Sequence, residues 1–314
     1  MKYNECISML TPLHGKGEAT AIVRTVMEER FGLSLSDLLL CKDTALSANE
    51  HHDLEKIMQE LLSGTPVQYV LGSARFCGRP FCVTPDVLIP RPETEQLVTL
   101  LPKGGVVADL GTGSGCIAVS VALDRDPKQV IAIDVSEKAI EVAKKNAKTH
   151  AADVEFILQD MLDIEATYNS LPQLDCIVSN PPYIRQSEAT EMSPTVTAHE
   201  PSIALFVPDN DPLLFYRAIG QIATRSLRSG GLLAVEANTA LTTDVAALFK
   251  SMKFQDISII DDCFGKPRFV TAISPGPRGP GERRIVERRR KKEKKRRIVE
   301  RRQKKRKESF SEKK

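Results

Sequence analysis

The sequence has no apolar stretch of the roughly 20 residues that a helix needs to cross a bilayer. Its first residues also lack a charged segment followed by an apolar one, so we expect no secretory signal and a cytoplasmic protein. The 314 residues, of which 41% are hydrophobic, are sufficient for one large or two modest domains with a packed core.

Closely spaced metal ligands are missing as well. The seven cysteines show no Cys-x-x-Cys spacing, and His51 and His52 are adjacent, so they cannot share one face of a helix. We therefore predict no metal site. Scattered thiols are typical of a reduced cytosol, although Cys77 and Cys82 lie close enough in sequence to form a disulfide.

Positive charge is scarce over most of the chain and concentrated at its end. The chain has 44 Lys and Arg against 41 Asp and Glu residues, a net charge of +3. From Ser274 to Lys314 these counts are 20 and 6, a net +14, which leaves 24 and 35, a net −11, for the rest. Prolines and glycines between positions 275 and 281 mark the join. We predict a basic tail over residues 275–314 on an acidic body.

The basic tail contains Arg-Arg-Ile-Val-Glu-Arg-Arg twice, at 283–289 and at 296–302. This shift turns a helix by about 220°, so the two copies share no apolar face and cannot form a core. Two interpretations remain. The tail is a solvated extension, disordered or helical with frayed ends, or it is an electrostatic tether that contacts RNA or ribosomes without sequence preference.

Helical patterns occupy the beginning of the acidic body. Apolar residues recur at helical spacing from Glu18 to about Leu40. A capping box at Ser47-Ala-Asn-Glu50 then predicts a second helix that stops at Gly64. After it, residues 75–83 are typical of a short hairpin with Gly78 and Arg79 in its turn.

From Val106 onward, strand-like runs alternate with helical patterns. This alternation predicts a parallel sheet covered by helices on both faces. The last two apolar runs, at 257–260 and 269–273, are too close together for a helical crossover. We therefore expect the sheet to end in an antiparallel hairpin.

The first chemical signal is Asp109-Leu-Gly111-Thr112-Gly113-Ser114-Gly115, which follows the first strand of this sheet. Glycines there either let the backbone approach a ligand at a helix N-terminus or only make a tight strand-to-helix turn. The dinucleotide fingerprint requires glycine at position 116, where Cys116 stands. The pattern instead resembles the cofactor loop of class I methyltransferases, which implies that residues 111–115 bind S-adenosylmethionine.

Two further segments support a cofactor site. Asp134 ends the next strand, where a carboxylate can accept hydrogen bonds from both hydroxyls of a ribose. Asp160 and Met161 follow the third strand, where this fold contacts the adenine; Asp160 can accept from its amine and Met161 can pack on the ring. Ordinary loop chemistry explains either of these last two residues equally well.

The most specific motif is Asn180-Pro181-Pro182-Tyr183, directly after the fourth strand. An amide nitrogen is a poor nucleophile, and the Asn180 oxygen and the Pro181 carbonyl can accept both of its N–H bonds and hold it beside a methyl donor. Two prolines stiffen the loop, and Tyr183 offers an aromatic face to a planar group. We predict that Asn180 and Pro181 are catalytic, that all four residues bind the substrate, and that Asn180 also contacts the cofactor.

Two other segments carry a closer resemblance. Gly64-Thr-Pro66-Val-Gln-Tyr69-Val-Leu-Gly72 and Leu88-Ile-Pro90-Arg-Pro92-Glu-Thr94-Glu95 resemble signatures of the bacterial peptide chain release factor glutamine N5-methyltransferases. The segment His199-Glu-Pro201-Ser-Ile-Ala-Leu205 also matches that family. The similarity extends from about Glu18 to Ile273 and does not include the basic tail.

This resemblance implies an α/β class I methyltransferase with a doubly wound, seven-stranded sheet and a small all-helical N-terminal domain. The implied parts are a substrate-docking domain at 1–72, a hairpin linker at 73–90 and a catalytic domain at 91–274. The implied reaction methylates the glutamine of the release factor GGQ loop with S-adenosylmethionine.

Two alternatives remain beside it. A methyltransferase acting on the amino group of a DNA or RNA base also fits Asn-Pro-Pro-Tyr, but not the acidic body. A non-catalytic ribosome-binding protein explains only the tail.

The basic tail generates a test. A chain that ends at Ser274 should methylate a free release factor at the full-length rate, because the tail has no apolar face with which to stabilise the body. If the tail is a tether, only the full-length chain should bind RNA, and its affinity should fall steeply as salt rises. Binding assays and melting temperatures at two salt concentrations check this; loss of methylation in the short chain would contradict the two-part division.

Overall fold

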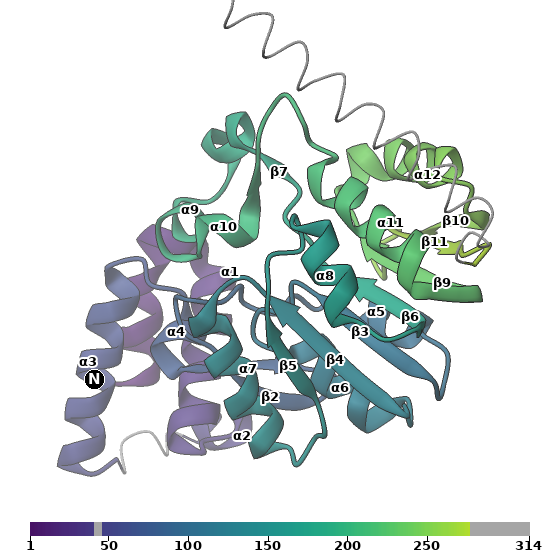
Figure 1. Cartoon of the computed structure of the whole chain (residues 1–314). Coiled ribbons are helices and arrows are strands. Elements are labelled where there is room, and N and C mark those ends of the chain that lie inside the picture. The colour runs from purple at the N-terminus through teal and green to yellow at the C-terminus, as the bar shows by residue number, and fades with distance from the viewer. Residues whose placement is uncertain (41–45, 277–314) are drawn as a thin grey trace, which may run out of the picture.

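Helices alone form the N-terminal part of the chain in this computed structural model, which describes residues 1–40 and 46–276. They are α1 (Tyr3–Phe31), α2 (Leu35–Leu39), α3 (Ala48–Leu62) and α4 (Val67–Leu71). Their buried side chains, Leu10, Val26 and Leu54 among them, share one core. These helices lie to one side of the main sheet (Figure 1). Cys41 and the tail from residue 277 onward lie outside the described residues, so the predictions for the tail stay predictions.

The first predicted helix, from Glu18 to about Leu40, is wrong in its bounds. The helix α1 already begins at Tyr3 and bends at Gly15, whose φ of 73° is not helical. It ends at Phe31 because Gly32, with φ 68°, takes the left-handed conformation that commonly terminates helices. Leu35–Leu39 is a separate helix with its own capping box at Ser34.

The second helix and the hairpin lie close to their predicted places. The Ser47 hydroxyl accepts from the backbone N–H of Glu50, and the Glu50 carboxylate accepts from the Ser47 N–H at 2.7 Å, which confirms the capping box. In the hairpin, β1 (Ser73–Phe76) pairs with β2 (Arg79–Cys82), so the predicted turn at Gly78-Arg79 is wrong by one residue. The turn is Cys77-Gly78, because both have the positive φ that a two-residue hairpin requires.

The thiols of this hairpin are not joined. Cys77 and Cys82 are both free, so the disulfide that their sequence spacing allows does not form.

Within the described residues, seven strands form the main sheet in the order β10-β11-β9-β6-β3-β4-β5. The strands β3, β4, β5, β6 and β9 are parallel neighbours, whereas β11 is antiparallel to both β9 and β10. This confirms the predicted doubly wound fold with a terminal antiparallel hairpin. The strands are β3 (Val106–Leu110), β4 (Gln129–Asp134), β5 (Glu155–Leu158), β6 (Leu174–Ser179), β9 (Leu227–Glu236), β10 (Gln255–Asp261) and β11 (Pro267–Ile273).

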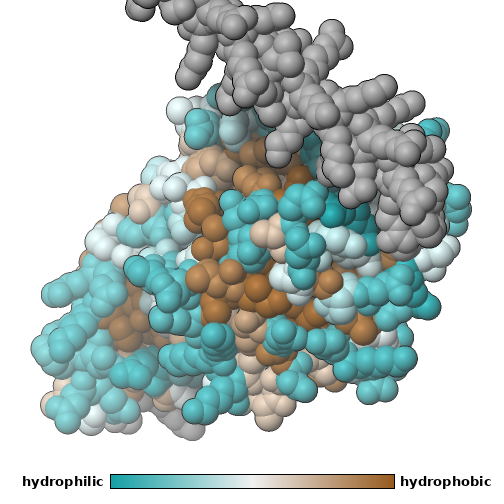
Figure 2. Space-filling view, viewed as in Figure 1, coloured by the Kyte–Doolittle hydropathy of each residue, from teal (hydrophilic) through white to brown (hydrophobic). Residues whose placement is uncertain are grey.

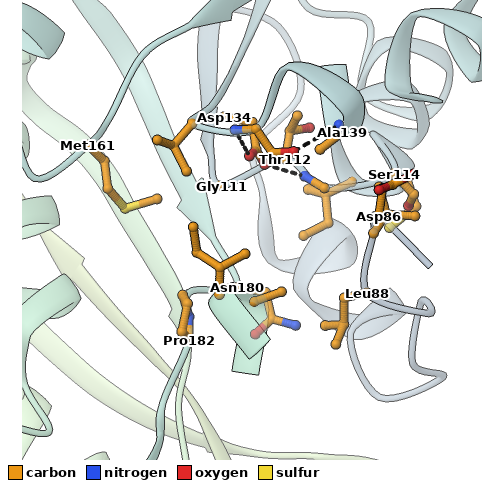
Figure 3. A pocket seen from close by; sticks show the side chains of 18 of the residues that line it. Asp86, Leu88, Gly111, Thr112, Ser114, Asp134, Ala139, Met161, Asn180 and Pro182 are labelled. Atoms are coloured by element: carbon orange, nitrogen blue, oxygen red, sulfur yellow. Dashed lines mark hydrogen bonds between the residues drawn. The ribbon is translucent and has the colours of Figure 1, made fainter. Parts of the chain in front are cut away.

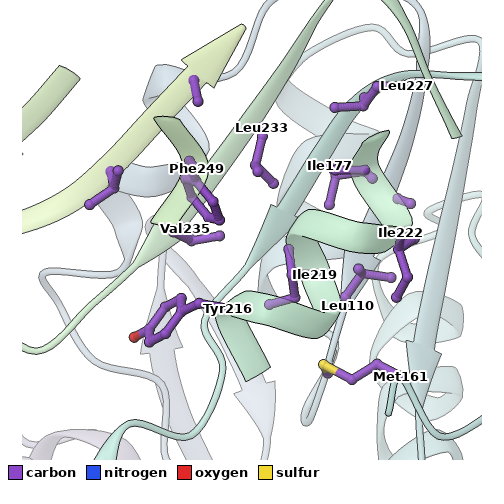
Figure 4. Packing of buried hydrophobic residues seen from close by; sticks show 14 of the residues in the cluster. Leu110, Met161, Ile177, Tyr216, Ile219, Ile222, Leu227, Leu233, Val235 and Phe249 are labelled. Carbon is purple, nitrogen blue, oxygen red and sulfur yellow. The ribbon is translucent and has the colours of Figure 1, made fainter. Parts of the chain in front are cut away.

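Helices cover both faces of the main sheet, and alternate strand residues face opposite sides. On one side, Leu110 and Ile177 pack in a cluster with Ile219 and Phe249 (Figure 4). On the other, Val107 packs with the cluster that includes the first helices after the hairpin. The helices are α5 (Glu95–Leu100), α6 (Cys116–Asp124), α7 (Glu137–Thr149), α8 (Ile164–Ser170), α11 (Leu214–Ser226) and α12 (Thr242–Ser251), the last preceded by the 3-10 turn η3 (Thr239–Leu241).

One segment interrupts the alternation of strands and helices. Residues 184–207, here called the inserted segment, connect β6 to α11 and contain short elements only. They are β7 (Ile184–Arg185), η2 (Gln186–Glu191), α9 (Pro194–His199), α10 (Ser202–Leu205) and β8 (Phe206–Val207). In Figure 1 the inserted segment lies at the upper edge of the molecule, above the sheet. None of the helices in the described part of the chain has the length and apolarity to span a membrane.

A single buried amide joins three elements of this fold. Asn146 in α7 accepts from the backbone N–H of Cys82 at 2.7 Å and donates to the Cys82 carbonyl at 2.9 Å. It also donates to the carbonyl of Ser114 at 2.8 Å. The hairpin and the glycine-rich loop are therefore held to α7 by one side chain, which is 1% exposed.

Replacing this amide tests its contribution to stability. Asn146→Ala should lower the free energy of unfolding by about 3 kcal/mol, because it leaves one N–H and two carbonyls without partners in the interior. Asn169→Ala, an exposed position on α8, is the control and should change stability by less than about 0.5 kcal/mol. Urea denaturation of the two variants measures both values, and equal midpoints would contradict the role given to Asn146.

Candidate active site

The glycine-rich loop joins the end of β3 to the beginning of α6. The backbone N–H groups of Gly111 and Thr112 both donate to the carbonyl of Ile133, at 2.8 and 3.0 Å. Gly111 has φ +78°, and a Cβ there would lie 3.0 Å from the Met161 methyl carbon, so only glycine fits without displacing it. The loop is therefore held against the end of the neighbouring strand β4 before any ligand binds.

Gly115, at the end of this loop, contributes to helix packing. It does not line the cavity described below, and a Cβ on it would lie 2.9 Å from the Cβ of Ala143 in α7. Its hydrogen side chain thus allows α6 and α7 to pack closely. The cofactor contact expected of Gly115 stays a prediction.

Two carboxylates accept hydrogen bonds from the same loop. The Thr112 hydroxyl donates to Asp109 at 2.7 Å, and burial raises the pKa of Asp109 to about 7. Asp134, at the end of β4, accepts from the N–H of Gly113 at 2.8 Å with one oxygen and from the N–H of Ser136 at 2.9 Å with the other. Burial raises the pKa of Asp134 as well. Each Asp134 oxygen retains a lone pair that can accept from a bound ligand.

The Asn-Pro-Pro-Tyr loop begins where β6 ends, beside β3. The hydroxyl of Ser179 donates to the carbonyl of Leu110 at 2.5 Å, which joins the ends of the two strands. The next residue, Asn180, donates through Nδ2 to the hydroxyl oxygen of Thr94 at 3.3 Å. Its Oδ1 is buried and has no hydrogen-bond partner among the described residues. A buried acceptor without a donor costs free energy, so this oxygen is available for an incoming N–H group.

The proline-rich segment at 88–94 contacts this loop through Thr94 and lines the cavities beside it through Leu88 and Arg91. Its conformation depends on Glu200 of the inserted segment, whose side chain is 1% exposed. The Glu200 carboxylate accepts from the backbone N–H of Ile89 at 3.2 Å and from the Arg91 guanidinium at 2.5 Å. From the other side, the Tyr69 hydroxyl donates to the carbonyl of Val87 at 2.6 Å. The N-terminal helices and the inserted segment are thus both connected to the rim of the site.

Two adjoining cavities meet at Asn180. The first, of about 220 Å³, is lined by all the predicted cofactor residues except Gly115 (Figure 3). The second, of about 180 Å³, is lined by Asn180, Pro181 and Tyr183 and by apolar side chains of the inserted segment. Pro182 faces the first cavity. The structure therefore brings the predicted cofactor and substrate residues to two sides of one asparagine. Their individual roles stay predictions.

The rim of the first cavity is apolar as well as open. Val135, Leu162 and Ile203 all line it, and Ile203 is 59% exposed. Figure 2 shows hydrophobic residues at the surface over the middle of the face, among hydrophilic ones. In the described part of the chain, no group of His, Cys, Asp or Glu side chains comes together that could hold a metal ion.

One buried acid of the site, Glu236, is not among the residues predicted from the sequence. Glu236 ends β9, is fully buried, and accepts from the Thr94 hydroxyl at 2.7 Å and from the Tyr183 hydroxyl at 3.2 Å. The available signal was an acid directly after the apolar run 232–235, the same arrangement as Asp134 after β4. Arg91, Thr94 and Glu200 lie in segments that the sequence marked only by family resemblance.

The titration of Glu236 predicts a pH effect on stability. Burial raises the pKa of Glu236 from 4.5 to about 7, so the folded state binds this proton more tightly than the unfolded state. Its contribution to stability is therefore complete below about pH 4.5 and is lost as the pH rises through about 7. From about pH 4 to about pH 8, the wild type should lose about 3 kcal/mol of unfolding free energy relative to Glu236→Gln.

Chemical denaturation across this pH range measures the difference. Asp109, whose pKa is raised to a similar value, is present in both proteins, so its effect cancels. A difference between the two proteins that does not change with pH would contradict the shifted pKa.

Comparison with known proteins identifies the two parts of this arrangement. Residues 7–72 match the family model described as the PrmC N-terminal domain, and residues 92–198 match the one described as the methyltransferase small domain.

Whole-length relatives agree with these matches. A release factor glutamine methyltransferase of Bacteroides thetaiotaomicron is 40% identical over 84% of this chain and 95% of its own length. The protein of that name from Flavobacterium psychrophilum is 37% identical with the same coverage of both chains. One from Neisseria gonorrhoeae is 41% identical over 68% of this chain and 78% of its own length. At this identity and coverage, the chain belongs to the release factor glutamine methyltransferase family.

Proposed function

We propose that this chain transfers the methyl group of S-adenosylmethionine to the N5 side-chain amide nitrogen of the glutamine in the GGQ motif of peptide chain release factors. The observation that carries the proposal is the buried, unpartnered Oδ1 of Asn180 at the junction of two cavities. The names of the relatives favour a release factor over a nucleic acid base, which the same loop also fits. A translation factor as substrate implies action in the cytoplasm.

The first cavity suits S-adenosylmethionine. Its Asp134 oxygens can accept from the ribose hydroxyls, the loop 111–114 offers backbone groups, and Met161 offers an apolar surface for the adenine beside Asp160. Gly111 lines this cavity without a side chain, which leaves room there for the Met161 side chain. When bound, S-adenosylmethionine supplies an electrophilic methyl group on a positively charged sulfonium.

The second cavity suits a glutamine side chain. A carboxamide entering it would meet Asn180, Pro181 and the ring of Tyr183. The Asn180 oxygen and the Pro181 carbonyl would accept the two N–H bonds and fix the nitrogen toward the first cavity. Such positioning replaces a random encounter and accounts for up to about 7–11 kcal/mol of a barrier. These residues act by orientation and hydrogen bonding. No base is needed before transfer, because a sulfonium is a strong methyl donor, and the amide nitrogen loses one of its protons after the methyl group has been transferred.

In this proposal the helical part, residues 1–72, binds the release factor. Residues 73–90 form the linker, and residues 91–274 form the catalytic domain. Two contacts hold the helical part to the linker. The Tyr69 hydroxyl donates a hydrogen bond to the carbonyl of Val87, and Arg75 in the hairpin pairs with Glu29 of α1 at 3.1 Å. Leu39 and Leu40, at the end of α2, are exposed apolar side chains available to a protein partner. A contact with RNA or ribosomes through the tail at 275–314, without sequence preference, remains part of the proposal.

Mass spectrometry tests the proposed reaction. Incubation of the chain and S-adenosylmethionine with a release factor should add one methyl group to the GGQ glutamine. Asn180→Ala should lower the rate on the order of 100-fold, because it removes the acceptor that orients the amide. Binding of S-adenosylmethionine, measured by calorimetry, should stay within a few-fold of wild type.

Two outcomes would contradict this proposal. A wild-type chain that leaves the GGQ glutamine unmodified would reject the substrate. An Asn180→Ala variant that fails only in cofactor binding, with unchanged turnover at saturation, would remove Asn180 from the transfer step.

A further inference from the structure

Behind the Asn-Pro-Pro-Tyr loop lies a connected set of buried polar side chains. The Glu236 carboxylate accepts from the Thr94 hydroxyl through Oε2 at 2.7 Å and from the Tyr183 hydroxyl through Oε1 at 3.2 Å. The Thr94 oxygen in turn accepts from Nδ2 of Asn180 at 3.3 Å. Glu236, on β9, is therefore connected to both ends of the loop, to Tyr183 directly and to Asn180 through Thr94, and it lines neither cavity.

The direction of these hydrogen bonds is fixed by proton count. An ionised carboxylate can only accept, whereas a hydroxyl has one proton and two lone pairs. The Thr94 proton must therefore point at Glu236, and a lone pair of the same oxygen faces Asn180. A side-chain amide can place either its NH2 or its oxygen at a given position, since the two have nearly the same shape. Here only the NH2 group can face Thr94, so the Asn180 oxygen must face away from it.

We infer that Glu236 and Thr94 are positioning residues that fix the flip of the Asn180 amide, so that its oxygen and not its nitrogen meets the methyl acceptor. The inference rests on the proposed function and extends it by two residues that do not themselves accept the substrate's N–H bonds. The opposite flip would present NH2 to the acceptor's own NH2, and transfer would fail.

The charge of Glu236 is part of this arrangement. Arg268, which is itself paired with Asp262 at 3.2 Å, stabilises the ionised form, while Glu93 and burial oppose it. Tyr183 faces the same carboxylate and donates to it. The pKa of Glu236 is raised to about 7, so near neutral pH the group titrates. A protonated Glu236 no longer compels Thr94 to donate to it, and the flip of Asn180 loses its constraint.

Removing the Thr94 hydroxyl tests the inference. Thr94→Val keeps the shape and removes no helix cap, because the hydroxyl caps nothing in α5. It should lower kcat for methyl transfer about 10- to 100-fold with little change in KM, and Thr94→Ser should restore most of the loss. Thr242→Val is the matched control: its hydroxyl donates to the Thr239 carbonyl, and both threonines are 3% exposed. Wild-type kcat in Thr94→Val would overturn the inference.

A second measurement does not depend on the substrate. In nitrogen-15 spectra, the side-chain amide signal of Asn180, assigned by its loss in Asn180→Ala, should shift as the pH passes about 7 in the wild type and stay constant in Glu236→Gln.

A third measurement uses the substrate. In the same pH range kcat should rise with pH in the wild type and be flat in Glu236→Gln. An identical titration in both proteins would overturn the inference.

The two proposals can fail separately. If the wild type does not methylate a release factor, the proposed function is rejected, while the amide signal still tests the link from Glu236 to Asn180. If the wild type methylates it and Thr94→Val does so equally well, only the positioning role is rejected.

Discussion

The parallel pairing of β3 with β4 and β6 is the constraint on which the site depends. Its register sets Leu110 beside Ile133 and Asp109 beside Val178, so the three strands end at one level. The residues that follow these ends, distant in sequence, then meet around one cavity. Two hydrogen bonds hold the three strand ends in this alignment. The Ser179 hydroxyl donates to the carbonyl of Leu110, and the N–H of Gly111 donates to the carbonyl of Ile133. A shift of one residue in either pairing would turn the polar groups into the core.

Much of this arrangement could be predicted from the sequence. The strand β3 begins at Val106, where the sequence predicts the first strand-like run, because a buried parallel strand is apolar on both faces and stands out as a run. Polar residues directly after such runs, as at Asp134 and Asn180, mark the ligand edge of the sheet. The glycine-rich loop and Asn-Pro-Pro-Tyr could be identified because each needs particular residues at consecutive positions.

Other features depend on contacts that no local pattern records. Pro12 and Gly15 conceal the first half of α1, which tertiary packing of Leu10 maintains. The link from Glu236 through Thr94 to Asn180 joins positions more than 80 residues apart, so spacing alone could not show it. The inserted segment consists of elements too short to have a period. Glu200, which holds this segment to residues 88–94, can be recognised only from its hydrogen bonds to Ile89 and Arg91 in the structure.

The division of the site into two cavities has an evolutionary consequence. The wall of the first includes the residues that follow the ends of β3, β4, β5 and β6, which the packing of the whole sheet holds in place, and only Ile203 and Ala204 of the inserted segment. Part of the wall of the second comes from the inserted segment, through Met192, Val196 and Leu205, which belong to no large sheet. Mutations there can accumulate without disturbing the main sheet or the glycine-rich loop. Descendants of such a chain can therefore diverge in what they modify while the donor of the modifying group stays the same.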